Sequence, residues 1–233
     1  MRFIRIDSPS RIWELDFLRG IALLIMVYFH VIFDLADIYG LKISYTSGII
    51  FYLGKFSVLL FIFIAGISST LSKNNVKRGA QIFVIAMLIT VVTHLVDDKL
   101  GVKFGILHFL GICMLLYPFI SKLNSKILFA LGILIIILGN YFTNIVSPND
   151  FLFILNLTSN NFYSSDYYPL LPWMGVYLFG IIIGRYAYSD RRSIFQRRIK
   201  DNIILMVGRN TLLIYLLHQP VILVALTIIF KLS

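Results

Sequence analysis

Seven apolar stretches, each long enough to cross a bilayer, run along the chain and are separated by short polar segments. A helix needs about 20 apolar residues to span the hydrocarbon core, because it rises about 1.5 Å per residue. The stretches lie near residues 17–36, 49–71, 79–97, 104–120, 127–146, 169–187 and 203–230. The last one is long enough to be tilted or broken near Gly208. This pattern predicts an all-α protein, a polytopic membrane helix bundle with about seven transmembrane helices.

The first stretch carries four ionisable groups on one face. At about 100° per residue, a single narrow face holds Asp16, Arg19, His30 and Asp34. Arg19 and His30 are separated by a rise of roughly 16 Å, about half the thickness of the hydrocarbon core. Because ionisable groups inside a membrane are costly, this face is a candidate functional site. A guanidinium offers phosphate a fixed fork of donors, and a neutral imidazole is a base near neutral pH.

Composition supports a membrane protein, and the charges predict its orientation. The chain is 59% hydrophobic and 14% charged, with a net charge of +10. Basic residues are concentrated before the first span and in alternate connections after it, so the positive-inside rule predicts a cytoplasmic N-terminus. Residues 1–15 would then be cytoplasmic, and 147–168 an extracytoplasmic loop. We expect one domain over residues 1–233, in the cell membrane, and no nucleic-acid partner, since the positive charge is a topology signal.

The same orientation places every histidine of the chain in the outer leaflet. They are His30, His94, His108 and His218. Three arginines lie toward the inner side instead, namely Arg19, Arg185 and Arg209. The sequence therefore predicts a basic inner vestibule below an outer histidine cluster, with His94 as an interfacial residue. No two histidines share a span at i and i+4, and Cys113 is the single cysteine, so we expect no metal site.

Most of these residues also have a purely structural interpretation. Arg19 can pair with Asp16, one turn away, as an anchor at the interface. His30 can be a hydrogen-bonded core histidine, and Asp34 can cap the helix end in water rather than orient the His30 ring. Both interpretations also stay open for the other two candidates, His108 and His218.

Five motifs occur in order over roughly residues 11–225. They are Arg11-Ile-Trp-Glu-Leu-Asp16-Phe-Leu-Arg19-Gly with His30-Val-Ile-Phe-Asp34-Leu, Phe61-Ile-Phe-Ile-Ala-Gly66-Ile-Ser, Phe104-Gly-Ile-Leu-His108-Phe-Leu-Gly, Asp166-Tyr-Tyr-Pro-Leu-Leu-Pro172-Trp-Met-Gly175 and Gly208-Arg-Asn-Thr-Leu-Leu-Ile-Tyr215-Leu-Leu-His218-Gln-Pro. Together they resemble the prokaryotic DUF1624 family, which shares a catalytic domain with heparan-α-glucosaminide N-acetyltransferase. The spacing between Arg19 and His30 also resembles that of the membrane acyltransferase-3 proteins.

This resemblance implies an acyl-CoA-dependent transmembrane acyltransferase. It would move an acyl group, acetyl above all, from cytoplasmic acetyl-CoA to a hydroxyl or amine of an extracytoplasmic sugar, glycan or glycolipid. We assign the donor-binding role to Arg19, Arg185, Arg209 and Asn210. We assign catalysis to His30 as general base, Asp34 as the group that holds its ring, and His218 or His108 as donor to the oxyanion. The pantetheine arm of coenzyme A is on the order of 15–20 Å long, comparable to the rise between Arg19 and His30.

Two alternatives stay open in this interpretation. The eukaryotic relatives place a proposed catalytic histidine in the loop after the first span, but residues 35–47 here contain none. Either His30 acts instead, as in the acyltransferase-3 proteins, or His108 or His218 is the base. A second route has the histidine itself acylated. The alternative function is a proton-coupled transporter or flippase that uses the same line of histidine and aspartate as a relay. It would predict inverted repeats, which we do not find. The acceptor, N- or O-acylation and the oligomeric state, a homo-oligomer included, stay open.

Overall fold

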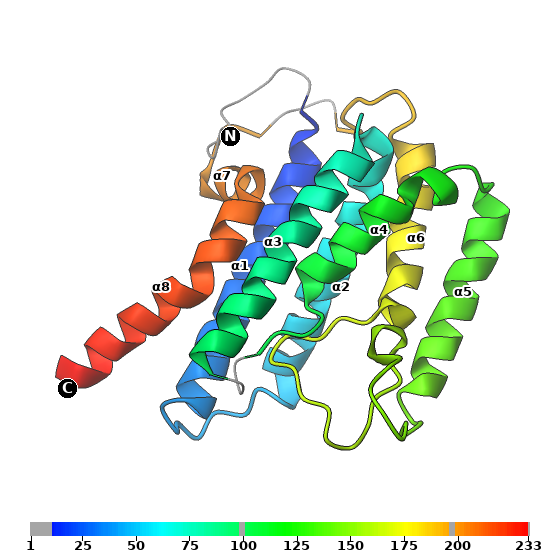
Figure 1. Ribbon diagram of the computed structural model, residues 1–233. Helices are drawn as coiled ribbons and strands as arrows, with labels where there is room; N and C mark the ends of the chain where they lie inside the picture. The colour runs from blue at the N-terminus through cyan, green and yellow to red at the C-terminus, as the bar shows by residue number, and fades with distance from the viewer. Residues whose placement is uncertain (1–10, 98–100, 196–198, 233) are drawn as a thin grey trace. The chain divides into compact units, whose positions relative to one another are not determined.

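The computed structural model describes residues 11–97, 101–195 and 199–232 (Figure 1). These residues form eight α-helices, one short 3-10 helix and two isolated β-bridges. The elements are α1 (Trp13–Asp37), α2 (Gly48–Leu71), α3 (Asn75–Val96), α4 (Ile106–Ile120), α5 (Ser125–Phe142), η2 (Phe153–Leu155), α6 (Leu170–Ala187), α7 (Ile203–Arg209) and α8 (Thr211–Leu232).

The helices confirm the predicted class, an all-α polytopic membrane protein. Six of them, α1, α2, α3, α5, α6 and α8, are long and apolar enough to cross a membrane, and α4 is a shorter apolar helix of 15 residues. Apolar segments become helices there because a bilayer offers no water to the backbone, so each N–H and C=O must bond within its own segment. The last predicted stretch is broken as expected, at Asn210 between α7 and α8.

Asparagine side chains fix where three of the helices begin. The first turn of a helix leaves backbone N–H groups without a partner inside the helix, and an asparagine at the N-cap can accept from one of them. Asn74 accepts from Lys77 N at 3.0 Å, Asn124 from Ile127 N at 2.9 Å and Asn202 from Leu205 N at 3.0 Å. The starts of α3, α5 and α7 are therefore set by local sequence.

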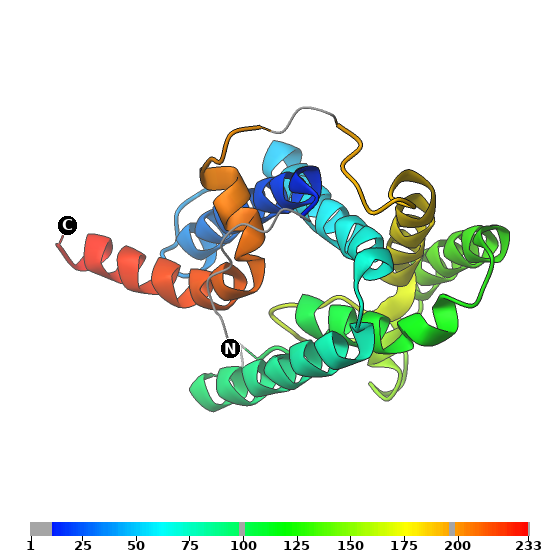
Figure 2. The same ribbon diagram turned by 90° about the horizontal axis from the view of Figure 1, so that it is seen from above.

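The chain divides into two compact units. The first comprises residues 1–64 and 190–233, and the second residues 65–189. In the first unit, α7 packs across the beginning of α1, and α8 continues along α1 (Figures 1 and 2). The Oγ of Ser57 on α2 donates to the Ala22 carbonyl of α1 at 2.8 Å. This unit holds the polar face that the sequence singled out.

Two glycines allow the close approach of α7 to α1. A Cβ on Gly208 would lie 1.7 Å from the carbonyl oxygen of Asp16, and a Cβ on Gly20 would lie 2.1 Å from that of Ile204. Both contacts are with backbone, which cannot turn aside as a side chain can. Small residues permit such backbone-to-backbone packing between helices in membranes. The residues that follow Gly208 are thereby held beside the start of α1.

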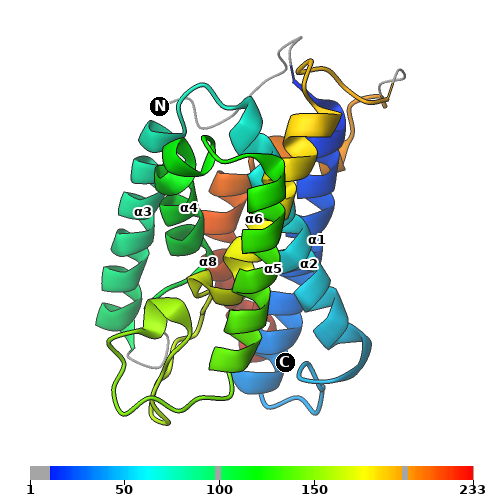
Figure 3. The same cartoon turned by 90° about the vertical axis from the view of Figure 1, so that its right-hand side faces the viewer.

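In the second unit, α3 pairs with α4 and α5 pairs with α6 (Figure 3). Tyr177 and Phe109 are fully buried, and the Tyr177 hydroxyl lies 2.6 Å from the Ser69 hydroxyl. This bond satisfies a polar group in an otherwise apolar interior.

The connection between α5 and α6 is tied to the segment that precedes α4. Ser165 N donates to the Gly101 carbonyl at 3.1 Å, and Tyr168 N donates to the Phe104 carbonyl at 2.8 Å. Within the loop, Ser159 N donates to the Asp150 carboxylate at 2.7 Å, which holds the pKa of Asp150 below its ordinary value. The loop is therefore an ordered element of the second unit.

Candidate functional site

The first unit brings two of the predicted catalytic histidines together. His30 on α1 and His218 on α8 face each other with their ring centroids 4.9 Å apart. Tyr215 lies one turn before His218, and the centroids of these two rings are 5.3 Å apart. His30 makes no hydrogen bond with the described residues, and its other ring contact is with Phe29. We call His30 and His218 the histidine pair.

Asp34 is held by a residue that the sequence analysis did not select. Its side chain has no exposed surface, and Gln219 Nε2 donates to both carboxylate oxygens at 2.9 Å. The alternative in which Asp34 caps the helix in water does not fit this burial. The carboxylate is bound by Gln219 and not by the His30 ring, so Asp34 ties α1 to α8.

The hydrogen bond of His218 to a backbone carbonyl indicates which ring nitrogen carries the proton. Nδ1 lies 2.5 Å from the carbonyl oxygen of Tyr215, which can only accept, so Nδ1 is the donor. In the neutral ring the lone pair is therefore on Nε2. That nitrogen is buried and has no hydrogen-bond partner among the described residues. Two roles are open for His218 from the sequence, donor to an oxyanion and general base, and an acceptor nitrogen suits the second.

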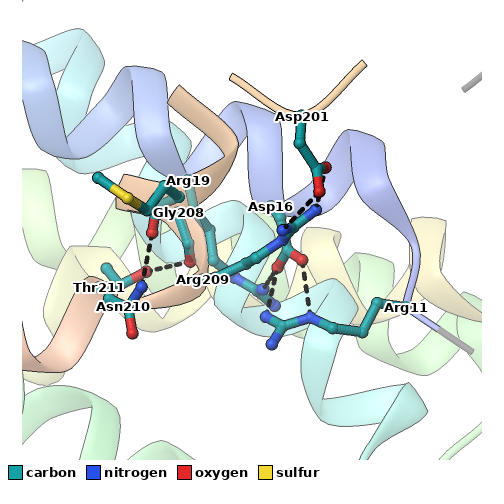
Figure 4. Close-up of polar contacts among 9 residues, drawn as sticks. Arg11, Asp16, Arg19, Asp201, Gly208, Arg209, Asn210 and Thr211 are labelled. Carbon is teal, nitrogen blue, oxygen red and sulfur yellow. Dashed lines mark hydrogen bonds and ion pairs between the residues drawn. The ribbon is translucent and has the colours of Figure 1, made fainter. Parts of the chain in front are cut away.

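A second polar group lies at the beginning of α1, where two arginines share one buried carboxylate (Figure 4). Asp16 is 2% exposed. Arg19 Nη1 donates to Asp16 Oδ1 at 2.7 Å. Arg11 donates through Nε to Oδ2 at 2.8 Å and through Nη2 to Oδ1 at 2.9 Å. Arg19 thus pairs with Asp16, as one of our two interpretations required. Asp16 therefore accepts from two guanidinium groups at once.

The last turn of α7 adds a third guanidinium to this group (Figure 4). Arg209 follows Gly208, which lies against the Asp16 backbone. Its Nη2 donates to Asp201 Oδ1 at 2.6 Å, with the Arg209 side chain 10% exposed and that of Asp201 53% exposed. We call Arg11, Arg19 and Arg209, with their carboxylates Asp16 and Asp201, the arginine cluster. Such a set of guanidinium forks suits a phosphate ligand.

A buried glutamate fixes the connection that precedes α7. Glu14 on α1 is 4% exposed and accepts from the hydroxyl of Ser193 at 2.7 Å and from Ile194 N at 2.8 Å. Trp13 adds a ring contact with Phe195, with centroids 5.8 Å apart. The start of α1 therefore holds both α7 and the connection before it.

The other two predicted donor-binding residues have structural partners. Asn210 ends α7, where its side-chain amide donates to the Met206 carbonyl at 2.9 Å. Arg185 belongs to the second unit and donates to the carbonyls of Leu123 and Ser121, at 2.6 and 3.0 Å. Cations stabilise a helix C-terminus in this way, so Arg185 caps the end of α4. A role of either residue toward a donor stays a prediction.

His108 also lies in the second unit, and both of its ring nitrogens are hydrogen-bonded. Gly105 N donates to its Nδ1 at 3.1 Å, and Nε2 lies 3.0 Å from the hydroxyl of Thr90, which itself donates to the Val102 carbonyl. His108 therefore donates through Nε2 and closes the N-terminus of α4. His94 donates through Nδ1 to the Thr90 carbonyl at 2.8 Å. These contacts favour structural roles for both histidines.

Gln219, Arg11 and Asp201 were missed as site residues. Gln219 gave a signal, since it is an amide beside a histidine in an apolar span, and such a group needs a partner at the same depth. Nothing in the sequence paired it with Asp34, because the register between α1 and α8 depends on tertiary packing. Arg11 and Asp201 look like ordinary charges of connecting segments.

The fold and these two groups define a class: a multi-pass helical membrane protein with a basic cluster near the start of its first helix and, farther along that helix, a half-buried histidine paired with one from the last helix. The family model described as heparan-alpha-glucosaminide N-acetyltransferase, catalytic, matches residues 11–220, and the chain belongs to this family. The resemblance inferred from the motifs is thereby confirmed. No curated protein and no solved structure matches the chain. The family name denotes an acetyltransferase, and acetyl-CoA is the donor that this family uses.

Proposed function

We propose that this protein is a transmembrane acetyltransferase that takes an acetyl group from cytoplasmic acetyl-CoA and passes it to a hydroxyl or amine of an extracytoplasmic sugar, glycan or glycolipid. The observation that carries the proposal is the placement of both polar groups along α1. That helix is continuous from Trp13 to Asp37, so Arg19 and His30 are separated by a rise of about 16 Å. The family to which the chain belongs supports the same chemistry.

In this proposal the arginine cluster binds the phosphates of acetyl-CoA. Phosphate oxygens would take donors that now serve Asp16 and Asp201. The pantetheine arm then runs along α1 toward the histidine pair. This explains why Arg19 and His30 occupy one helix at two depths.

The histidine pair would carry the transfer itself. His218 Nε2 takes the proton from the acceptor hydroxyl or amine as its oxygen or nitrogen attacks the thioester carbonyl carbon. His30 donates an N–H to the oxyanion that forms. The carbon–sulfur bond then breaks, and the His218 imidazolium returns its proton to the leaving thiolate. This is the competing assignment that the sequence left open, with His218 rather than His30 as the base, and the bond to the Tyr215 carbonyl supports it.

Incubation of the purified protein with labelled acetyl-CoA and a membrane glycolipid extract tests this proposal. We expect label in the glycolipid fraction together with an equal amount of free coenzyme A. A His218→Gln protein of normal thermal stability is the control. Release of coenzyme A without labelled acceptor, at equal rates in both proteins, would contradict the proposal.

A further inference from the structure

Two buried hydrogen-bond acceptors lie on neighbouring residues of α8 and have no partner among the residues described. They are His218 Nε2 and Gln219 Oε1. Both side chains face α1, where His218 meets His30 and Gln219 meets Asp34 one turn farther along. Buried polar atoms in folded proteins are nearly always hydrogen-bonded, so two neighbouring buried acceptors without a hydrogen-bond partner require an explanation.

The bonds already made prevent either side chain from satisfying itself. If the Gln219 amide turned over, its oxygen would face the Asp34 carboxylate, and two acceptors would repel each other. The two hydrogen bonds from Gln219 Nε2 to Asp34 therefore hold Gln219 Oε1 away from that carboxylate. The Tyr215 carbonyl fixes His218 in the same way. Together these residues offer acceptors, and a ligand that complements them must bring two donors.

We propose that Gln219 selects the acceptor substrate by accepting a hydrogen bond from a hydroxyl next to the group that becomes acetylated. The inference rests on the proposed function. The reacting hydroxyl or amine gives its proton to His218 Nε2, and the neighbouring hydroxyl donates to Gln219 Oε1. Adjacent substituents of a sugar ring lie close enough to serve adjacent side chains. Gln219 thus binds the acceptor, and Asp34 positions Gln219.

Two matched acceptors test this proposal: octyl glucosaminide and its deoxy analogue, from which the hydroxyl next to the amine has been removed. The measurement is kcat/KM for acetyl transfer to each. A neutral hydrogen bond corresponds to about a threefold to tenfold preference of the wild-type protein for the complete sugar. The ratio between the two acceptors, rather than either rate, reports on Gln219.

The decisive variant is Gln219→Lys, because an ammonium group still donates to Asp34 but has no acceptor oxygen. We expect its ratio to fall to about one. Asp34→Asn is the second variant, since it releases the Gln219 amide and should also lower the ratio. Thr227→Val is the control. Thr227 lies on the same helix and meets Tyr39 at 3.1 Å, away from the pair of acceptors, so its ratio should equal that of the wild type.

The outcomes separate the inference from the proposed function. If Gln219→Lys and Asp34→Asn lower both rates equally and keep the wild-type ratio, Gln219 only holds Asp34, and the inference is overturned. A wild-type ratio of one overturns it as well. If the wild-type protein binds acetyl-CoA but acetylates neither sugar, the proposed function fails for such acceptors, and the selection proposed for Gln219 fails with it.

Discussion

In the function that we propose, the tautomer of His218 makes this residue, rather than His30, the base of the histidine pair. A backbone carbonyl occupies Nδ1, so the lone pair of the neutral ring is on Nε2, buried and bare. His30 has no comparable bond with the described residues. Two imidazoles in ring contact are therefore not equivalent, and their substitutions should not be equivalent either.

We expect His218→Gln to cost more than His30→Gln. Loss of a positioned base typically costs about a hundredfold to ten-thousandfold in rate. A glutamine at position 30 can still donate an N–H to the oxyanion and should keep more activity. Turnover of labelled acetyl-CoA, measured in detergent with thermal stability checked, compares the two. A His30→Gln protein that is the less active of the pair would return the base to His30, as the sequence alone indicated.

A separate prediction concerns Asp201, because this residue bonds the guanidinium of Arg209, to which we assign phosphate binding. Asp201→Asn removes a competing carboxylate, so the affinity for coenzyme A should rise by about twofold to tenfold. Arg19→Ala should lower it. The control is Asp37→Asn, which removes the same charge at the other end of α1, where Asp37 bonds Tyr45. Isothermal titration decides, and weaker binding by Asp201→Asn would show that this residue does not compete with the ligand.

At the scale of elements, the contact of α7 with α1 positions the arginine cluster. A Cβ at Gly208 would overlap the Asp16 carbonyl, and overpacking of this kind costs about 1–3 kcal/mol. We expect Gly208→Ala to shift α7, lower the melting temperature and weaken coenzyme A binding. Gly132→Ala on α5 is the matched control, because the three atoms nearest to its Cβ would belong to the ring of Phe179, which can move. Equal coenzyme A binding by both variants would contradict the assigned role of α7.

The helices themselves were largely predictable, because apolar length and asparagine caps are local properties. The length of the last stretch predicted that it is either tilted or broken near Gly208, and the structure has it broken. The polar face of α1 was also predictable, since periodicity places Asp16, Arg19, His30 and Asp34 on one side. The partners of that face were not. The bond from Gln219 to Asp34 joins positions 185 residues apart, and a single sequence carries no record of that register.

Two predicted site residues show that the type of a residue does not reveal its role. Arg185 and His108 have the residue types expected of a donor site and a base, yet the first caps α4 at its end and the second at its start. Residue type alone does not distinguish a histidine with a bare nitrogen from one with both nitrogens bonded. That distinction needs the positions of backbone groups, which only the fold supplies.

At the scale of the whole molecule, the positive-inside rule predicts the side of each connection. In a Cys113→Ala background, single cysteines at Lys122 and Lys200 should be labelled from the cytoplasmic side, and one at Asn160 from the other side. All three positions are exposed, so labelling reports on sidedness rather than on burial. Labelling of Lys122→Cys and Asn160→Cys from one side would remove the basis for assigning donor and acceptor to opposite faces.

Transfer across the bilayer is the central claim, and proteoliposomes test it whatever the orientation of the protein. Acetyl-CoA is placed inside or outside the vesicles, and a membrane-impermeant glucosamine oligosaccharide is placed on the same side or on the opposite side. If donor and acceptor meet along α1 from opposite faces, acetylated sugar should form when the two are separated by the membrane. It should be nearly absent when both are outside, and absent with His218→Gln in either arrangement. Equal product from substrates on one side and from substrates on opposite sides would contradict the account.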